Sequence, residues 1–238
     1  MRRRITPERI ASEAGAELAE AFGPALRTVV LYGSTGHPDF RPERSDINLA
    51  AVAGPLSFAE LQRVAQRYAR WRGERVAAPL LLAPADLARS LDVFPLEMLD
   101  IQARHRTLAG EELFRNLPIA RAAVRLECER EAKGKLLRLR ALYLELAGSI
   151  LDLRALIIDS RKSFLHVMRG LLWVRGLGWE TREAAAVAAF ARAFDCALPV
   201  FEHLAGGRHP GPIEERFADY VAEIEAIATL ADAAETPA

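Results

Sequence analysis

The sequence has little of what marks several common classes of protein. It has only two cysteines, Cys128 and Cys196, with no paired spacing, so neither a disulfide framework nor a zinc site is indicated. Its 32 basic and 32 acidic residues leave a formal net charge of zero. Because proteins that bind duplex nucleic acid usually carry a basic excess, a nucleic acid is not the expected partner.

Long apolar runs are also absent, as are internal repeats and low-complexity tracts. The longest apolar runs are far shorter than the roughly 20 residues that a membrane-spanning helix needs. The charged start, Met1-Arg-Arg-Arg, leads into an amphipathic segment with acidic residues, unlike a signal or transit peptide. We therefore expect a soluble, cytoplasmic protein without a membrane partner. Its 51% hydrophobic content over 238 residues suits one large domain or two small ones.

A short apolar run near the N-terminus, Val29–Tyr32, ends at a glycine and a serine. The run is β-branched and aromatic, which is typical of a buried strand. At Gly33-Ser34 the glycine lets the backbone turn tightly and approach a ligand closely, so the turn is a candidate phosphate site. The connection that follows carries Pro38 and Pro42, and its length suits a lip over a cleft rather than a tight hairpin.

A second apolar run, Ile47–Val52, follows this connection. If the run forms a strand, Asp46 and Asn48 alternate with Ile47 and project from the same face. Carboxylate and amide oxygens on one strand face, beside a glycine-serine turn, are what a magnesium-bound triphosphate needs. The alternative is an ordinary hairpin-like connection in which Asp46 and Asn48 face solvent.

These residues resemble the signature of the DNA polymerase beta-like nucleotidyltransferase superfamily, of the aminoglycoside and minimal nucleotidyltransferase type. In that signature a Gly-Ser turn is followed, after a connection of similar length, by Asp-hydrophobic-Asp. Gly33-Ser34 and Asp46-Ile47 match it position by position. Asn48 does not, because the family has a second carboxylate at that position.

The resemblance implies an α+β fold, in which a nucleotidyltransferase-like mixed sheet flanked by helices precedes a C-terminal helical bundle. We expect the first domain to span residues 1–116 and the bundle to span residues 117–238, because the apolar period changes to 3.6 after a short linker. In the first domain the pattern predicts helices from Pro7, over 58–71 and from Asp86, and further strands over 76–82 and 94–101. In the bundle it predicts helices over 119–147, 149–175, 180–196 and 212–235.

The family's third catalytic carboxylate lies on a strand that corresponds to residues 76–82, and no acidic residue is present there. The predicted strand over 94–101 carries Glu97 and Asp100 on opposite faces. Because the Leu96-Glu97 context is similar to that of the third carboxylate in aminoglycoside enzymes, Glu97 is the candidate catalytic base. The alternative is an edge-strand charge without a catalytic role.

The resemblance implies that Asp46 and Asn48 are Mg²⁺ ligands and catalytic residues, with a nucleoside triphosphate at the turn. The candidate nucleotide-binding residues are Gly33, Ser34, Thr35, Arg44, Ser45, Lys133 and Lys135. The lysines lie in the first predicted bundle helix, where Glu129 and Lys133 interrupt an apolar stripe. An i,i+4 ion pair explains that interruption without a ligand. The expected stripe is Ile119, Ala122, Leu126, Leu137, Ala141 and Leu144.

Two functions from different classes are consistent with this sequence. The first is an enzyme that transfers a nucleoside monophosphate to a hydroxyl of a small molecule or a protein. The second is a catalytically degenerate protein that binds a nucleotide or a partner, similar to the minimal nucleotidyltransferase antitoxins. Replacing a carboxylate ligand by an amide removes an attraction to the metal ion on the order of several kcal/mol. We expect this loss to weaken catalysis more than nucleotide binding. The acceptor, the base preference and the oligomeric state are not predicted.

Overall fold

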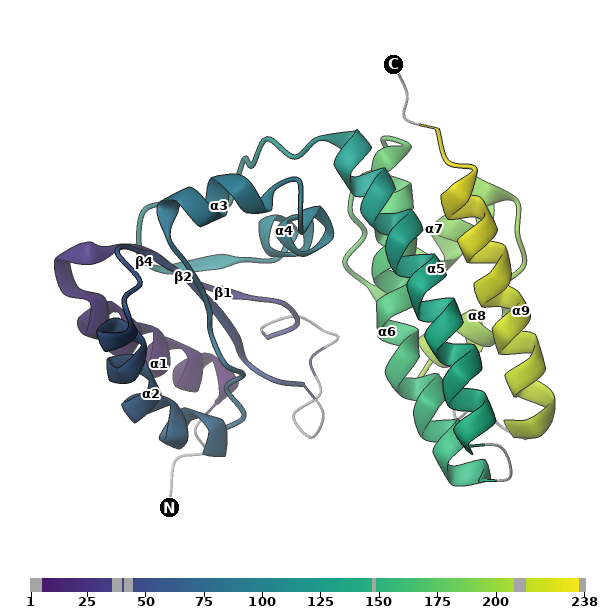
Figure 1. Cartoon of the computed structure of the whole chain (residues 1–238), viewed down its shortest axis with the longest axis horizontal. Helices are drawn as coiled ribbons and strands as arrows, with labels where there is room; N and C mark the ends of the chain where they lie inside the picture. Colours follow the sequence, from purple (N-terminus) through teal and green to yellow (C-terminus); the bar gives the residue numbers. More distant parts are fainter. Residues whose placement is uncertain (1–5, 36–39, 41–44, 147–148, 208–212, 236–238) are drawn as a thin grey trace. The chain divides into compact units, whose positions relative to one another are not determined.

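A computed structural model describes residues 6–35, 40, 45–146, 149–207 and 213–235. The chain divides into two compact units, Met1–Pro118 and Ile119–Ala238 (Figure 1). The first unit combines a sheet with helices and the second unit is helical, so the α+β prediction is confirmed. No described helix has the length and apolar character needed to cross a bilayer.

The first unit contains a four-stranded mixed sheet in the order β3-β2-β1-β4. Strand β1 is antiparallel to both β2 and β4, whereas β2 and β3 are parallel. The elements in chain order are α1 (Pro7–Phe22), η1 (Gly23–Ala25), β1 (Leu26–Tyr32), β2 (Asn48–Ala53), α2 (Phe58–Gly73), β3 (Leu80–Leu82), α3 (Pro84–Ser90), α4 (Pro95–Ala103) and β4 (Arg106–Gly110).

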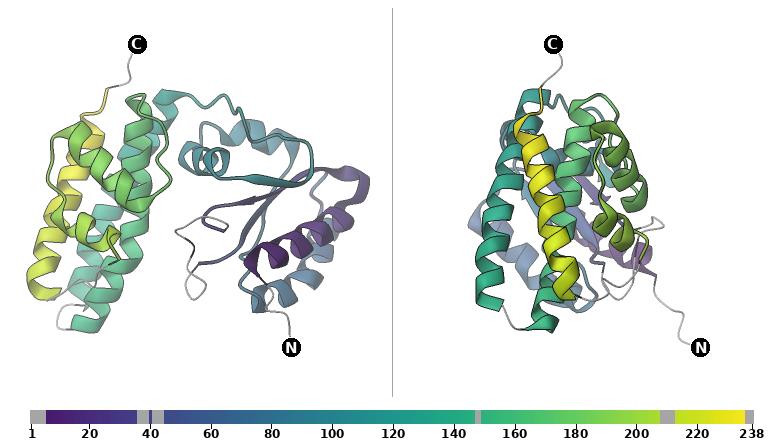
Figure 2. Two further views of the ribbon diagram at one scale, coloured as in Figure 1. Left: turned by 180° about the vertical axis from the view of Figure 1, so that it is seen from behind. Right: turned by 90° about the vertical axis from the view of Figure 1, so that its right-hand side faces the viewer.

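Helix α1 begins where its sequence predicts. Thr6 Oγ1 accepts a hydrogen bond from Arg9 N at 3.3 Å, and Pro7 occupies a position where its missing N–H costs nothing. The apolar faces of α1 and α2 join the sheet in one hydrophobic core, in which Leu18 and Trp71 are fully buried. These two helices lie on one side of the sheet, and α3 and α4 lie on the other (Figures 1 and 2).

Three predictions in the first unit need correction. Residues 94–101 do not form a strand: Phe94 is the N-cap of helix α4, which begins at Pro95 and buries most of its side chains, with Glu97 exposed. A short apolar run bounded by proline fits a buried helix as well as a strand, and the period alone does not separate them. The third strand is shorter than predicted, because Pro79 separates a single bridge, Ile47 to Val76, from β3. Strand β4 was not predicted as a strand.

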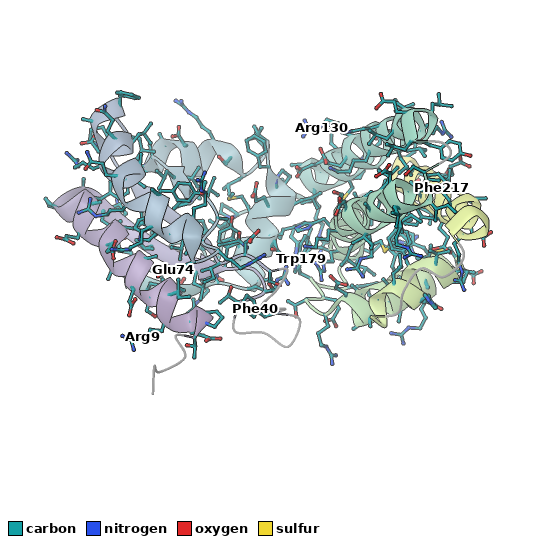
Figure 3. All side chains as sticks on the ribbon, turned by 90° about the horizontal axis from the view of Figure 1, so that it is seen from below. Arg9, Phe40, Glu74, Arg130, Trp179 and Phe217 are labelled. Atoms are coloured by element: carbon teal, nitrogen blue, oxygen red, sulfur yellow. The ribbon has the colours of Figure 1, made fainter. Side chains whose placement is uncertain are left out.

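The second unit is built from packed helices, and α6 packs against α5, α7 and α9. Its elements are α5 (Arg121–Leu146), α6 (Ile150–Val174), α7 (Glu183–Phe194), α8 (Pro199–Ala205) and α9 (Ile213–Asp232). The short α8 was not predicted. Phe217 of α9, labelled in Figure 3, stacks on Tyr143 of α5 with 4.9 Å between the ring centroids.

The predicted apolar stripe of α5 is wrong. Leu126, Leu137 and Leu144 are 60%, 64% and 78% exposed. Leucine and other apolar residues occupy two faces of this helix, so the pattern alone does not say which face meets the bundle. The buried side chains of α5 are Val124, Cys128, Ala132, Leu136 and Leu139.

A carboxylate from one bundle helix caps another. Glu223 of α9 is 6% exposed and accepts hydrogen bonds from Val200 N at 2.7 Å and Phe201 N at 3.0 Å, in the first turn of α8. Burial raises the pKa of Glu223, and the two backbone hydrogen bonds oppose that shift. This contact connects α9 with a helix too short to be stable alone.

Candidate nucleotide-binding site

The turn after β1 needs a glycine for two reasons. Gly33 has φ +82°, and a Cβ added there would lie 3.0 Å from Asn48 Nδ2. The β1–β2 register pairs Tyr32 with Asn48, which explains why the amide lies against the turn. The fold therefore brings together the Gly-Ser turn and the Asp-x-Asn segment, although a connection separates them in sequence.

Thr35, two residues after Gly33, has a buried side chain whose hydroxyl is unsatisfied among the described residues. It is 5% exposed, and its Oγ1 has no hydrogen-bond partner among the described residues. A buried hydroxyl without a partner costs about 1–3 kcal/mol, so such groups often serve a ligand. Ser34, between Gly33 and Thr35, is partly exposed.

Asp46 lies one residue before the bridge that starts β2. Ile47 is 2% exposed, whereas the Asp46 side chain is 57% exposed, as expected for an alternating segment. Asp46 Oδ1 accepts a hydrogen bond from Arg75 Nη2 at 3.1 Å, and Arg75 Nε donates to Ser45 O at 3.3 Å. The sequence reasoning missed Arg75, because no motif in the first apolar runs points to it.

Glu97 lies on helix α4, not on a strand, so Glu97 and Asp100 do not lie on opposite faces of a sheet. Burial raises the pKa of Tyr32 to about 12, with further contributions from the negative charges of Glu97 and Asp100. The charges of both carboxylates therefore act on the hydroxyl of Tyr32, the last residue of β1. Partial burial raises the pKa of Glu97, and the negative charge of Asp100 adds to that shift. Part of the Glu97 side chain remains exposed to solvent. Asp100 is buried and pairs with Arg104.

At the level of sequence, the chain matches no protein-family model and no curated protein. Its structure is similar to that of spectinomycin adenyltransferase AAD(9) from Enterococcus faecialis, solved with ATP and spectinomycin. The match covers 95% of this chain and 99% of that chain, with a TM-score of 0.59 and 13% sequence identity. The chain has a nucleotidyltransferase-like fold.

Two toxin–antitoxin structures match a smaller part of the chain. One contains AMP-PNP, and it matches 55% of this chain with 20% identity and a TM-score of 0.31. The other is a tri-AMPylated Shewanella oneidensis HEPN toxin with its MNT antitoxin, and it matches 57% of this chain with 18% identity and a TM-score of 0.31. Each match covers 98% of the other chain. At these scores the likeness adds nothing to the fold assignment.

Two residues near the turn offer oxygen ligands of the kind that Mg²⁺ takes in proteins. Among the described residues, no group of three or more His, Cys, Asp and Glu side chains lies together as a metal site. Asp46 supplies a charged oxygen and Asn48 a neutral one, so the pair fits an ion that is also coordinated by a triphosphate's own oxygens. The metal-ligand roles of Asp46 and Asn48 stay predictions.

The two candidate lysines belong to the second unit and are engaged in ion pairs. Lys133 Nζ lies 2.8 Å from Glu129 Oε1, which confirms the expected i,i+4 pair, and it also binds Asp232. The hydrogen bond to Asp232, followed by that to Glu129, raises the pKa of Lys133. Lys135 Nζ lies 2.9 Å from Glu131 Oε2. A role for either lysine in nucleotide binding stays a prediction, and Arg44 lies outside the described residues.

Proposed function

We propose that this protein binds a nucleoside triphosphate at the Gly33-Ser34 turn of its nucleotidyltransferase fold. The triphosphate carries a Mg²⁺ ion, and Asp46 and Asn48 complete the coordination of that ion. Ser34, Thr35 and Ser45 line the nucleotide-binding site. Arg44, Lys133 and Lys135 are further candidates for contact with the phosphates.

The observation that carries this proposal is the geometry of the turn. Gly33 leaves little room for a side chain because Asn48 lies against it, and Thr35 offers a buried hydroxyl that the described residues do not satisfy. A turn with no side chain lets a phosphate approach backbone N–H groups closely, and a hydroxyl can donate to a phosphate oxygen. A glycine at positive φ also occurs in purely structural turns, so the buried Thr35 hydroxyl is the feature that favours a ligand.

Transfer of the nucleoside monophosphate to a hydroxyl acceptor is the first candidate activity. It is supported by Glu97, whose pKa is raised by burial and whose charge also raises the pKa of Tyr32, the last residue of β1. A raised pKa moves a carboxylate toward the range in which it can accept a proton at neutral pH. In this role Glu97 would take the proton of the attacking hydroxyl on a small molecule or a protein.

Binding without transfer, to a nucleotide or a protein partner, is the second candidate. Two observations favour it: β3 is Leu80–Leu82 and contains no acid, and the carboxylate of Asp46 is paired with Arg75. A protein of this kind would keep the nucleotide site and lose the ion that activates the acceptor.

Isothermal titration calorimetry with ATP and GTP, each with Mg²⁺ and with EDTA, tests the binding proposal. We expect Mg²⁺-dependent heat for at least one triphosphate, reduced in Asp46→Ala. Absence of heat at millimolar ligand would refute nucleotide binding. Pyrophosphate release with a panel of hydroxyl acceptors, spectinomycin among them, then separates the two candidates. Release points to the enzyme, and tight binding without release points to the pseudoenzyme.

A further inference from the structure

Helix α2 ends in a Schellman motif with an arginine at the position that usually holds glycine. Val76 N donates to Trp71 O at 3.0 Å, and Arg75 N donates to Arg72 O at 3.2 Å. Arg75 adopts φ +65°, a left-handed conformation that is strained for a residue with a side chain. Glu74, labelled in Figure 3, marks the end of the helix. A glycine would fit this backbone better, so the side chain of Arg75 calls for an explanation.

The side chain of Arg75 contacts the segment that leads into β2. Its guanidinium binds Ser45 O and the carboxylate of Asp46, at 3.3 and 3.1 Å. The backbone already joins the two segments, because Ile47 N donates to Arg75 O at 2.9 Å and Ala77 N donates to Ile47 O at 3.0 Å. The side chain adds a hydrogen bond to Ser45 O and a positive charge beside Asp46.

Stability does not account for this charge. The side chains of Arg75 and Asp46 are 45% and 57% exposed, and exposed ion pairs contribute little to stability. Strain at a left-handed residue opposes even that small gain. An unfavourable conformation that is retained at a candidate binding site is a reason to look for a function.

We propose that Arg75 is an internal counterion that competes with divalent cations for Asp46. In the absence of nucleotide, the guanidinium neutralises the carboxylate and repels a free ion. When a metal-bound triphosphate enters, its phosphate oxygens offer the guanidinium a more highly charged acceptor, and Asp46 becomes available to the metal. Arg75 thereby selects the metal–nucleotide complex over the free ion. The nucleotide step rests on the proposed function, whereas the competition at Asp46 does not.

Coulomb's law sets the size of the expected effect. A single positive charge roughly 6 Å from a divalent ion, in a medium as polar as water, weakens binding of that ion about tenfold. A lower effective dielectric would make the effect larger. Removing the charge of Arg75 should therefore tighten binding of a free divalent ion by about tenfold or more.

The test measures Mn²⁺ binding by electron paramagnetic resonance in the absence of nucleotide. Arg75→Gln removes the charge and keeps the backbone strain, Arg75→Gly removes both, and Arg75→Lys keeps the charge. Arg72→Gln, which removes an exposed charge from the same helix end, is the matched control. We expect about tenfold tighter Mn²⁺ binding in Arg75→Gln and Arg75→Gly, and little change in Arg75→Lys and the control.

Two results would overturn the proposal. The first is equal Mn²⁺ affinity, or no binding, in the natural protein and Arg75→Gln. The second is a gain in Mn²⁺ binding that survives Asp46→Ala in the Arg75→Gln background, since the ion would then lie elsewhere. Arg75→Gly also tests a purely structural role. If the hydrogen bonds of the Arg75 side chain to Ser45 and Asp46 stabilise the fold, the melting temperature of this variant should fall. If Arg75 acts as a counterion at a strained position, the melting temperature should be equal or higher.

A separate ATP titration of the same variants distinguishes failure of this proposal from failure of the proposed function. If no variant binds ATP but Arg75→Gln gains Mn²⁺ affinity, the counterion role stands and the nucleotide site is wrong. If all variants bind ATP and none differs in Mn²⁺ affinity, the nucleotide site stands and the counterion role is wrong.

Discussion

Substitution of Gly33 by alanine is the most direct perturbation of the candidate site. The new methyl group would lie 3.0 Å from Asn48 Nδ2, closer than the ordinary contact range of 3.4–4 Å, so the amide would have to move. The backbone φ of +82° would in addition be strained for alanine, at about 1–2 kcal/mol. We expect Gly33→Ala to lower the free energy of unfolding by about 2 kcal/mol, since the two effects add only in part.

Gly134→Ala is the matched control for this substitution. Gly134 lies in the interior of helix α5, exposed, with no atom within 4 Å of an added Cβ. Alanine there should raise the free energy of unfolding by about 0.5–1 kcal/mol, because glycine is the poorer helix former. The same chemical change is therefore expected to act with opposite signs at the two positions.

The assay is scanning calorimetry without ligand, followed by ATP titration of each variant. Calorimetry suits this chain because two compact units can give two transitions. Gly33→Ala should lower the transition of the first unit and weaken ATP binding, and Gly134→Ala should raise that of the second unit and leave ATP binding unchanged. Natural stability together with natural ATP affinity in Gly33→Ala would refute both the geometry of the turn and its role.

Three further predictions test other parts of the site and fold. Asn48→Asp is nearly isosteric, so it should change the fold little, and its added negative charge should tighten Mg²⁺ binding in a titration. Weaker Mg²⁺ binding together with slower pyrophosphate release would instead indicate an enzyme adapted to the amide. Asp46→Ala should weaken Mg²⁺-dependent nucleotide binding much more than Glu97→Ala, and equal effects in calorimetric titrations would show that the metal site is misassigned. Because burial raises the pKa of Glu223 in the folded state, its stabilising contribution is present below the unfolded pKa and lost as pH rises through the folded pKa. Urea unfolding from pH 4 to 7 should therefore show a steeper loss of stability with rising pH in the natural protein than in Glu223→Gln, and parallel curves would contradict this assignment.

The sequence determined the features that depend on near neighbours in the chain. Thr6 and Pro7 start α1 through local capping, and the predicted helix is present. The turn needed a residue that tolerates positive φ, and Gly33 provides it. The β-branched and apolar runs on both sides of the connection form β1 and β2, which places Asn48 against the turn. Through its resemblance to a family signature, this stretch predicted the nucleotidyltransferase-like fold that the structure has.

The tertiary structure decided which apolar runs are strands and which helix faces are buried. Residues 94–101 read equally well as a strand and as a buried helix, and in the folded chain Leu96, Met98, Leu99 and Ile101 are buried from helix α4. Leucines occupy both faces of α5, and only the bundle decides that Val124 and Leu139 are buried while Leu144 is exposed. Both outcomes depend on the surface against which a segment packs, and the residues of the segment do not specify that surface.

The environment of Asp46 also depended on the tertiary structure. Its partner Arg75 is 29 residues away in sequence and lies after a helix, at a position where the backbone pattern favours glycine. The contact exists because α2 returns the chain to the start of β2, where Ile47 and Val76 form a bridge. The sequence predicted the Asp46 carboxylate beside a candidate phosphate-binding turn. The positive charge of Arg75 beside that carboxylate depends on the fold, because the fold brings two distant segments within hydrogen-bond distance.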